Sequence, residues 1–251
     1  MLILALDTTS EVGGVAIYRD AECLAMASSE GLADRYSVTL FEMVERALAQ
    51  AHLTLSDIEL YAAANGPGSF TGIRVGLAAA RAWGKVFARP VHGVSVMEAM
   101  VENQGLGNVG WGLERPQPEW CFPILDARRG EFYLGSFRRS PSGPSDAQMP
   151  KYEAVDEGWV LKPDALRTCL LERVATGESA SCVVRAHDQS ALDFCASLPR
   201  SLRWRQVEGA LLDAIASIAL RENRAGRACP SAKLDAYYIR RPDAEIKLAA
   251  D

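Results

Sequence analysis

The chain has 251 residues, 49% of them hydrophobic and 24% charged, which is typical of a globular protein with one large or two compact domains. Its net charge of −5 argues against a protein that binds nucleic acid by itself, because phosphate neutralisation supplies most of that affinity. No run approaches the roughly 18 apolar residues of a membrane span, and the N-terminus lacks the basic region of a signal peptide. We therefore expect a cytoplasmic protein.

The first hundred residues are predicted to alternate between strands and helices. Strands are expected at 2–7, 13–19, 22–28, 60–65 and 90–95. Helices are expected at 34–53, 69–88 and 96–103. The first helix has apolar residues at i, i+3 and i+4 with charges elsewhere, and either Asp34 or Ser37 is expected to cap it.

Residues 66–76, GPGSFTGIRVG, look like a phosphate-binding loop but match neither common type. A Walker A loop needs a lysine where this chain has Ile73. The dinucleotide fingerprint needs G-x-G-x-x-G, in which the third glycine comes three residues after the second. Here the glycines lie at 66, 68 and 72, so this last spacing is one residue too long. We therefore expect a tight turn with Ser69 as the helix N-cap, rather than a phosphate site.

The helix after this turn carries small residues at every fourth position: Gly72, Gly76, Ala80 and Gly84. They form one smooth ridge along the helix. Because a glycine in a helix interior costs about 1 kcal/mol relative to alanine, we expect another backbone to lie close to the ridge. Two alternatives remain, packing against the chain's own sheet or against a helix of a second subunit.

The second half begins with a stretch, 121–137, that resembles the N-terminus. Each has an apolar strand ending in an aspartate (Asp7 or Asp126), a polar turn, a glycine and a second apolar strand. Duplicated actin-like ATPase domains begin each half in this way. We therefore predict an α/β protein with the actin-like (ASKHA) fold, in which two tandem ribonuclease-H-like domains each have a mixed sheet flanked by helices.

The predicted domain boundary lies in the segment 105–119, which is rich in glycine and proline. It divides the chain into domains 1–104 and 105–251, the last helix being free to pack back on the first domain. A second loop is expected at 138–150, and helices at 163–174 and 209–224.

In an actin-like ATPase the turn after the first aspartate wraps the β- and γ-phosphates. This chain offers one carboxylate and three hydroxyls there: Asp7, Thr8, Thr9 and Ser10. The second hairpin does not complete the clasp, because Arg128 stands where a glycine is needed. Gly209 and Gly226 stand alone, so no glycine pair seats an adenine. We predict a vestigial phosphate site and no independent ATPase activity.

Metal and nucleophile chemistry have little support in the sequence. The cysteines are scattered singly, as expected for reduced, half-buried thiols: Cys23, Cys121, Cys169, Cys182, Cys195 and Cys229. No two of His52, His92 and His187 lie within one helical turn, so no histidine pair faces a metal from one helix. There is also no G-x-S-x-G elbow. We predict neither catalytic residues nor a metal site.

Three stretches together resemble the bacterial TsaB (YeaZ) family: ILALDTTSEVGGVAIY, ANGPGSFTGIRVGLAAARAWGKVFARPVHGVSVMEA and LDARRGEFYLGSF. The tail YYIRR is similar to the Tyr-Leu-Arg ending of that family. The likeness is close over 1–100 and 121–137 and weak elsewhere. Its G-P-G-S-F-T-G-[LIV]-R run is highly specific.

TsaB resembles TsaD, the enzyme that transfers a threonylcarbamoyl group to the adenosine beside the anticodon in tRNA. TsaD carries a histidine-pair metal site, which TsaB and this chain lack. The resemblance implies a non-catalytic partner and activator of TsaD, joined by the ATPase TsaE, with only indirect contact to tRNA and none to a membrane. It also implies a homodimer in the absence of TsaD. No cofactor is implied for the chain itself, and ATP or ADP is left open only at the interface with TsaD.

The implied partner surface runs along 35–48 and 69–83, the first two helices. The expected contact residues are Arg35, Tyr36, Ser37, Leu40, Phe41, Val44, Phe70, Gly72, Arg74, Val75 and Gly76. Aromatic residues and arginine dominate such contacts, so Tyr36, Phe41 and Arg74 are the expected hot spots. The chain departs from the family at Tyr36, where relatives usually have histidine.

Two other functions compete with this one. An actin-like ATPase or sugar kinase would bind Mg-ATP with micromolar affinity as an isolated chain. A glycoprotease-type metallopeptidase would contain stoichiometric zinc, and the lack of metal ligands disfavours it.

Overall fold

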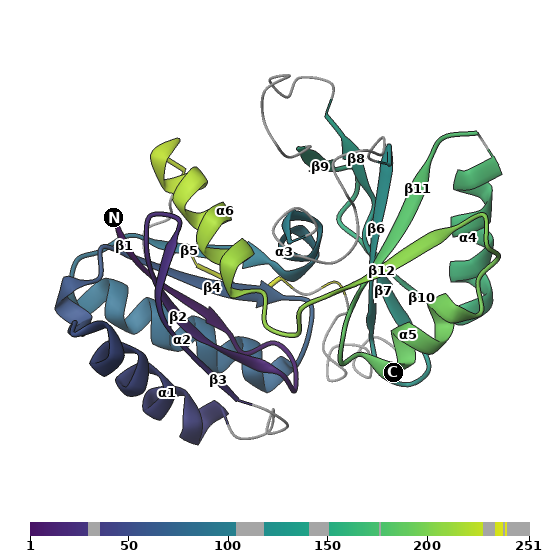
Figure 1. Ribbon diagram of the computed structural model, residues 1–251. Coiled ribbons are helices and arrows are strands. Elements are labelled where there is room, and N and C mark those ends of the chain that lie inside the picture. Colours follow the sequence, from purple (N-terminus) through teal and green to yellow (C-terminus); the bar gives the residue numbers. More distant parts are fainter. Residues whose placement is uncertain are drawn as a thin grey trace, which may run out of the picture.

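The computed structural model describes residues 1–29, 36–103, 118–140, 151–175, 177–227, 234–237 and 239. They form two lobes, each with a mixed sheet and helices packed on it (Figure 1). The first sheet has the order β3-β2-β1-β4-β5. The second has the order β10-β7-β6-β11-β12, with β8 paired to β6 and β9 paired to β8.

The first lobe follows the predicted elements closely. It contains β1 (Leu2–Asp7), β2 (Gly13–Arg19), β3 (Glu22–Ser29), α1 (Tyr36–Ala51), the short 3-10 helix η2 (Leu55–Asp57), β4 (Leu60–Gly66), α2 (Phe70–Val86), β5 (Val91–Ser95) and α3 (Val96–Glu102). The predicted N-cap of α2 is confirmed, since the Ser69 hydroxyl accepts a hydrogen bond from the Gly72 N–H at 3.2 Å. For α1, Asp34 lies outside the described residues and Ser37 lies inside the first turn, so Ser37 is not the N-cap.

The second lobe contains more elements than the sequence predicted. They are β6 (Trp120–Asp126), β7 (Phe132–Leu134), β8 (Phe137–Arg139), β9 (Tyr152–Ala154), β10 (Trp159–Leu161), α4 (Pro163–Ala175), β11 (Ala180–Arg185), α5 (Gln189–Ala196) and β12 (Arg203–Val207), followed by α6 (Leu212–Arg224). The prediction of a loop from residue 138 was wrong for Arg138 and Arg139, because both pair with β9 as part of β8. The rest of that loop, 141–150, lies outside the described residues.

The two hairpins occupy equivalent places in their sheets, as the sequence repeat predicted. β1 pairs antiparallel with β2 and parallel with β4. β6 pairs antiparallel with β7 and parallel with β11. The domain boundary after residue 104 stays a prediction, because 104–117 lie outside the described residues.

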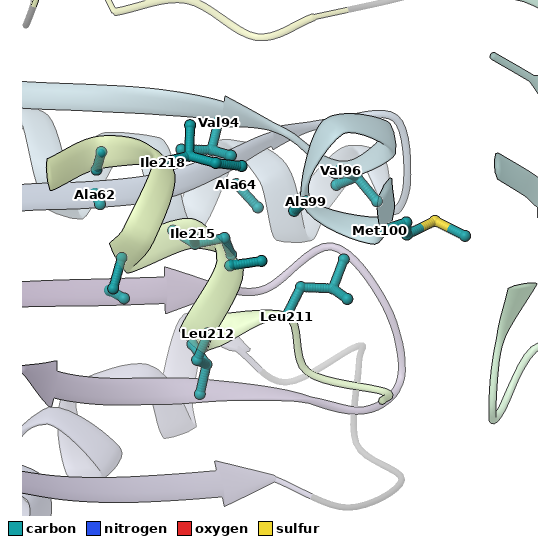
Figure 2. Packing of buried hydrophobic residues seen from close by; sticks show 14 of the residues in the cluster. Ala62, Ala64, Val94, Val96, Ala99, Met100, Leu211, Leu212, Ile215 and Ile218 are labelled. Atoms are coloured by element: carbon teal, nitrogen blue, oxygen red, sulfur yellow. The ribbon is translucent and has the colours of Figure 1, made fainter. Parts of the chain in front are cut away.

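Helix α6 packs on the first sheet although the chain reaches it from the second lobe. Its apolar side spans the sheet from Leu212 over the first hairpin to Ile218 beside Val94 of β5, while α1 and α2 cover the other face of the sheet (Figures 1 and 2). Ala62 and Ala64 of β4 allow this close approach. The same hydrophobic cluster extends into the second sheet, so α3 and α6 share one core with both lobes.

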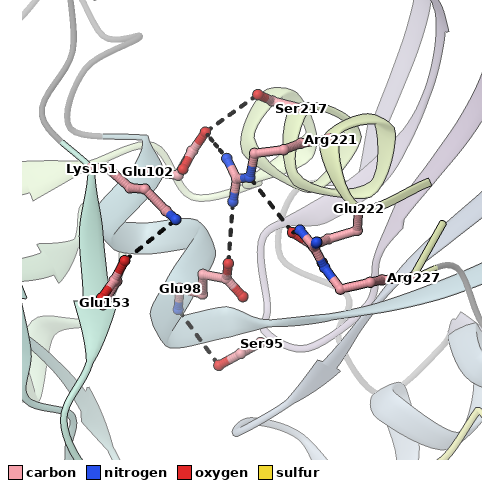
Figure 3. A network of polar contacts seen from close by, with 9 residues as sticks. All are labelled: Ser95, Glu98, Glu102, Lys151, Glu153, Ser217, Arg221, Glu222 and Arg227. Carbon is pink, nitrogen blue, oxygen red and sulfur yellow. Dashed lines mark hydrogen bonds and ion pairs between the residues drawn. The ribbon is translucent and has the colours of Figure 1, made fainter. Parts of the chain in front are cut away.

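Polar contacts fix the angle between α6 and α3. Arg221 of α6 reaches Glu102 at 2.8 Å and Glu98 at 3.3 Å, both on α3 (Figure 3). Burial raises the pKa of Glu98, although the Arg221 charge opposes that rise. Ion pairs that are this exposed contribute little stability, so the network mainly orients the two helices.

The half-buried histidine on β5 is expected to make the free energy of unfolding depend on pH. Burial lowers the pKa of His92 below its usual value, so the unfolded chain binds more protons below about pH 6.5, the ordinary pKa of histidine. Stability is therefore expected to fall as the pH drops from 7 to 5.5. His92→Gln should reduce that fall, measured by urea unfolding at both pH values. His52→Gln, at an exposed position, is the control, and an unchanged pH slope in His92→Gln would contradict the assignment.

Candidate functional site

The glycine-rich stretch 66–76 packs against the turn that follows β1. The Ser69 N–H donates to the Thr9 carbonyl at 2.7 Å, and the Thr8 hydroxyl donates to the Gly72 carbonyl at 2.7 Å. Gly66 has φ of +118°, a conformation that favours glycine. A Cβ on Gly72 would collide with the Thr8 carbonyl, and one on Gly76 with the Thr8 hydroxyl. At this end the ridge therefore packs against the chain's own turn at 7–10, and not against the sheet that the first alternative named.

Asp7, the aspartate of the predicted vestigial phosphate site, pairs with Arg185 at the end of β11. The Arg185 Nη2 donates to the Asp7 carboxylate, its Nη1 donates to the Thr9 hydroxyl at 3.0 Å, and its Nε donates to the Gly209 carbonyl at 2.8 Å. Asp7 also accepts hydrogen bonds from the Thr9 N–H, the Thr9 hydroxyl and the Leu211 N–H. Asp7 is 0% exposed and Arg185 is 1% exposed. The two lobes therefore meet at a fully buried ion pair.

Sequence reasoning did not identify Arg185. The available signal was the same one that marked Asp7, an apolar strand (ASCVVR) that ends in a charged residue. What the sequence did not contain was the pairing, since Arg185 and Asp7 are 178 residues apart and belong to different sheets.

The hydroxyls of the turn at 7–10 are also engaged within the chain. Thr8 bonds to α2 and Thr9 bonds to Asp7, while the Ser10 hydroxyl donates to the Val12 carbonyl at 2.7 Å. The residues present do not fit a metal-bound nucleotide in the ancestral manner, because a guanidinium already satisfies the carboxylate that would face it. The vestigial phosphate site predicted at these four residues stays a prediction.

The second hairpin lies opposite the first and contributes another cation. Arg128 Nη2 lies 3.5 Å from the Glu11 carboxylate and Arg128 Nη1 lies 3.7 Å from that of Asp126. Arg128 and Arg129 both have positive φ, which places the turn in a conformation rare for residues with side chains. Since Arg128 and Glu11 are exposed, their pairing is weak. The place of the phosphate clasp is thus taken by an arginine-bearing turn.

The cysteines and histidines form no metal site in the part of the chain that the structure describes. No group of three or more His, Cys, Asp or Glu side chains is arranged there to hold a metal ion. Cys121, Cys182 and Cys195 are buried free thiols, whereas Cys23 is exposed, contrary to the prediction of half-buried cysteines. Cys229 lies outside the described residues. Among the described helices, none is long and apolar enough to cross a membrane.

The residues predicted to bind a partner separate into a buried and an exposed set. Buried in the chain's own core are Tyr36, Leu40, Val44, Gly72 and Gly76. For these five the structure corrects the prediction, because they face the sheet or the turn at 7–10 and support the surface instead of forming it. Ser37, Phe41, Phe70 and Arg74 are exposed and Val75 is half-buried. Arg35 lies outside the described residues.

The exposed set belongs to a continuous surface made by the outer sides of α1 and α2, here called the α1–α2 face. It presents the large apolar side chains Val38, Phe41, Phe70 and Val86, between 44% and 73% exposed. Phe41 meets Trp83 edge-on with ring centroids 6.0 Å apart, and the Arg74 guanidinium lies 3.7 Å above the Phe70 ring. Val38 and Val86 were not predicted, since their positions on the polar side of each helix gave no signal.

The two helices of this face differ in charge. α1 exposes Glu42 and Glu45 together with Arg46, whereas α2 has no acidic residue and exposes Arg74, Arg81 and Lys85. A cavity of about 520 Å³ continues the basic side, between α2 and residues 234–236. Exposed apolar groups bordered by charge are typical of a surface that docks another protein.

Residues 30–188 match the family described as "TsaD: tRNA N6-adenosine threonylcarbamoyltransferase". The chain is 32% identical over 143 residues to the tRNA threonylcarbamoyladenosine biosynthesis protein TsaB of Escherichia coli (strain K12), covering 57% of this chain and 58% of that one. It is 31% identical over 185 residues to the protein of the same name from Haemophilus influenzae, covering 72% and 74%. The chain covers less than two thirds of the length of several relatives, among them the Escherichia coli protein and, at 65%, the TsaB of Bacillus subtilis.

Solved structures share the whole architecture at lower sequence identity. YeaZ from Pseudomonas aeruginosa superposes with a TM-score of 0.67 at 20% identity, over 94% of this chain and 100% of that one. A Pseudomonas aeruginosa protein described as similar to peptidase YEAZ gives 0.69 at 20% identity, over 95% and 99%. Together with the two mixed sheets, this confirms the predicted α/β fold, with the architecture of YeaZ.

Proposed function

The chain belongs to the TsaB (YeaZ) family, and we propose that it serves as a non-catalytic partner and activator of TsaD in making threonylcarbamoyladenosine in tRNA. The observation that carries this proposal is the closure of the ancestral nucleotide site by Arg185. A chain whose first aspartate is bound by an internal guanidinium has no open carboxylate for a metal-bound phosphate. Its contribution to the reaction is then made through its surface.

The α1–α2 face supplies that surface in this proposal. Phe41 and Phe70 are rigid aromatic anchors with apolar neighbours, and such anchors provide most of the binding energy at protein interfaces. The charges around them set the orientation of the partner. Because TsaD is a relative of this family, its corresponding helices are the expected counterpart.

The same face supports the proposed homodimer in the absence of TsaD. In the proposed homodimer a two-fold axis sets α1 of one copy against α2 of the other, so that the helix with exposed glutamates meets the basic helix. Binding of TsaD and homodimer formation then exclude each other. TsaE would join the TsaD complex in the cytoplasm, tRNA would contact this chain only indirectly, and ATP or ADP would lie only at the interface with TsaD.

Replacing Phe41 by serine is expected to weaken binding to TsaD by about 30-fold, since truncating an aromatic anchor costs about 2 kcal/mol or more. The affinity is measured by titration calorimetry with purified TsaD from the same organism. Trp159→Ser is the matched control, because Trp159 is equally exposed but lies on β10 of the second lobe. Failure of the unaltered chain to bind TsaD would refute the proposed function.

The competing ATPase is tested on the same protein. We expect no micromolar binding of Mg-ATP to the isolated chain, because Arg185 holds Asp7. A clear binding isotherm that disappears in Asp7→Asn would favour the ATPase instead. Metal analysis tests the disfavoured metallopeptidase, which requires stoichiometric zinc.

A further inference from the structure

We infer that Arg185 positions the α1–α2 face from the opposite lobe, so that it controls partner binding without touching the partner. The inference rests on the proposed partner function for its biological meaning. Its physical content is a chain of contacts from β11 of the second lobe, through the turn at 7–10, to the first turns of α1 and α2.

The first step is the hold of the second lobe on the turn. Arg185 bonds to both Asp7 and Thr9, and the Leu211 N–H bonds to Asp7 at 3.2 Å. Gly209, which accepts the Arg185 Nε–H, also packs against Val12. Charge-assisted hydrogen bonds in a buried place define geometry tightly, because water cannot replace either partner. A movement of the second lobe therefore moves the turn at 7–10 with it.

The second step leads from the turn to α2. Thr8 bonds to the Gly72 carbonyl, the Thr9 carbonyl accepts the Ser69 N–H, and Gly72 and Gly76 lie directly on Thr8. Since no side chain separates Gly72 from the Thr8 carbonyl, a shift of the turn is transmitted to the first turns of α2. Those turns carry Phe70 and Arg74 on the outer side.

The third step leads from the turn to α1. The Tyr36 hydroxyl donates to the Ser10 carbonyl at 3.0 Å, and Gly13 leaves the space that this hydroxyl occupies. Tyr36 is buried and begins α1, one turn before Phe41. Both helices of the face therefore start on the former phosphate turn. The position of this turn is therefore set by Arg185.

The test compares Arg185→Met and Arg185→Lys with Arg167→Met, which removes a second-lobe arginine that donates hydrogen bonds to Ser197 and lies over the Phe194 ring, away from the turn at 7–10. In both Arg185 variants we expect faster amide hydrogen exchange at 36–44 and 66–76. We also expect TsaD binding about 2- to 30-fold weaker, the range for residues that act through a contact network. Arg167→Met should change neither.

Two further arms keep the outcome decisive. Guanidinium ions added to Arg185→Ala should restore slow exchange at 66–76, whereas sodium chloride at equal ionic strength should not. Unchanged exchange in Arg185→Lys together with unaltered affinity overturns the inference. Since exchange is measured without a partner, failure of TsaD to bind the unaltered chain refutes the proposed function and leaves the contact chain separately tested.

Discussion

Gly72→Ala is expected to lower the free energy of unfolding by about 3 kcal/mol or more, despite the higher helix propensity of alanine. The new Cβ would collide with the Thr8 carbonyl oxygen and carbon, both of them backbone atoms in a buried turn. Neither atom moves without disturbing the bonds to Arg185 and Ser69 described above. Urea unfolding, followed by circular dichroism, measures the change.

Gly76→Ala supplies the matched comparison one helical turn later. Its Cβ meets only the side chain of Thr8, chiefly the hydroxyl. Combining it with Thr8→Ala should therefore recover stability, so that the two changes together cost less than their sum. Thr8→Ala should give Gly72→Ala no such relief, because the backbone carbonyl remains. Equal rescue of both glycine variants would show that the close backbone contact at Gly72 is wrong.

The first lobe was predictable because its elements are long and its apolar residues follow clear periods. The strand at 60–66 and the helix at 70–86 are examples, and the Ser69 cap was fixed by local sequence alone. The small strands β8, β9 and β10 have three residues each, too few for a period to appear. Their pairing depends on partners distant in sequence, which local patterns do not contain.

The candidate site was predicted in parts. The turn at 7–10 and the glycine ridge were recognised, but their mutual packing was not predicted, because the alternatives considered for the ridge were the chain's own sheet and a second subunit. The exposure of Phe41, Phe70 and Arg74 agrees with the predicted surface, but Tyr36 was assigned outward on its residue type although its helical position faces the sheet. A tyrosine on the apolar side of a helix is buried together with its apolar neighbours, and its hydroxyl then donates to a backbone carbonyl.

Arg185→Met and Asp7→Asn are each expected to destabilise the chain by about 3 to 5 kcal/mol, because each leaves one charge buried without its partner. The double variant removes both charges and should cost less than the sum by about 3 kcal/mol, the upper end for residues in contact. The asparagine carbonyl still accepts a hydrogen bond in the turn, which limits the damage at Thr9. Urea unfolding of the four proteins completes the cycle.

An exposed ion pair in the same fold provides the control for this cycle. Arg224 of α6 lies 2.7 Å from Asp20, and both side chains are exposed, so Arg224→Met should destabilise the chain far less than Arg185→Met. Added salt should weaken that pair, yet it should leave the Asp7–Arg185 coupling nearly unchanged, because counter-ions do not reach a buried contact. An equally small loss in the free energy of unfolding for Arg185→Met and Arg224→Met would contradict this prediction. The shared apolar core would then hold the two lobes together, and the Arg185 guanidinium would only fill space between them.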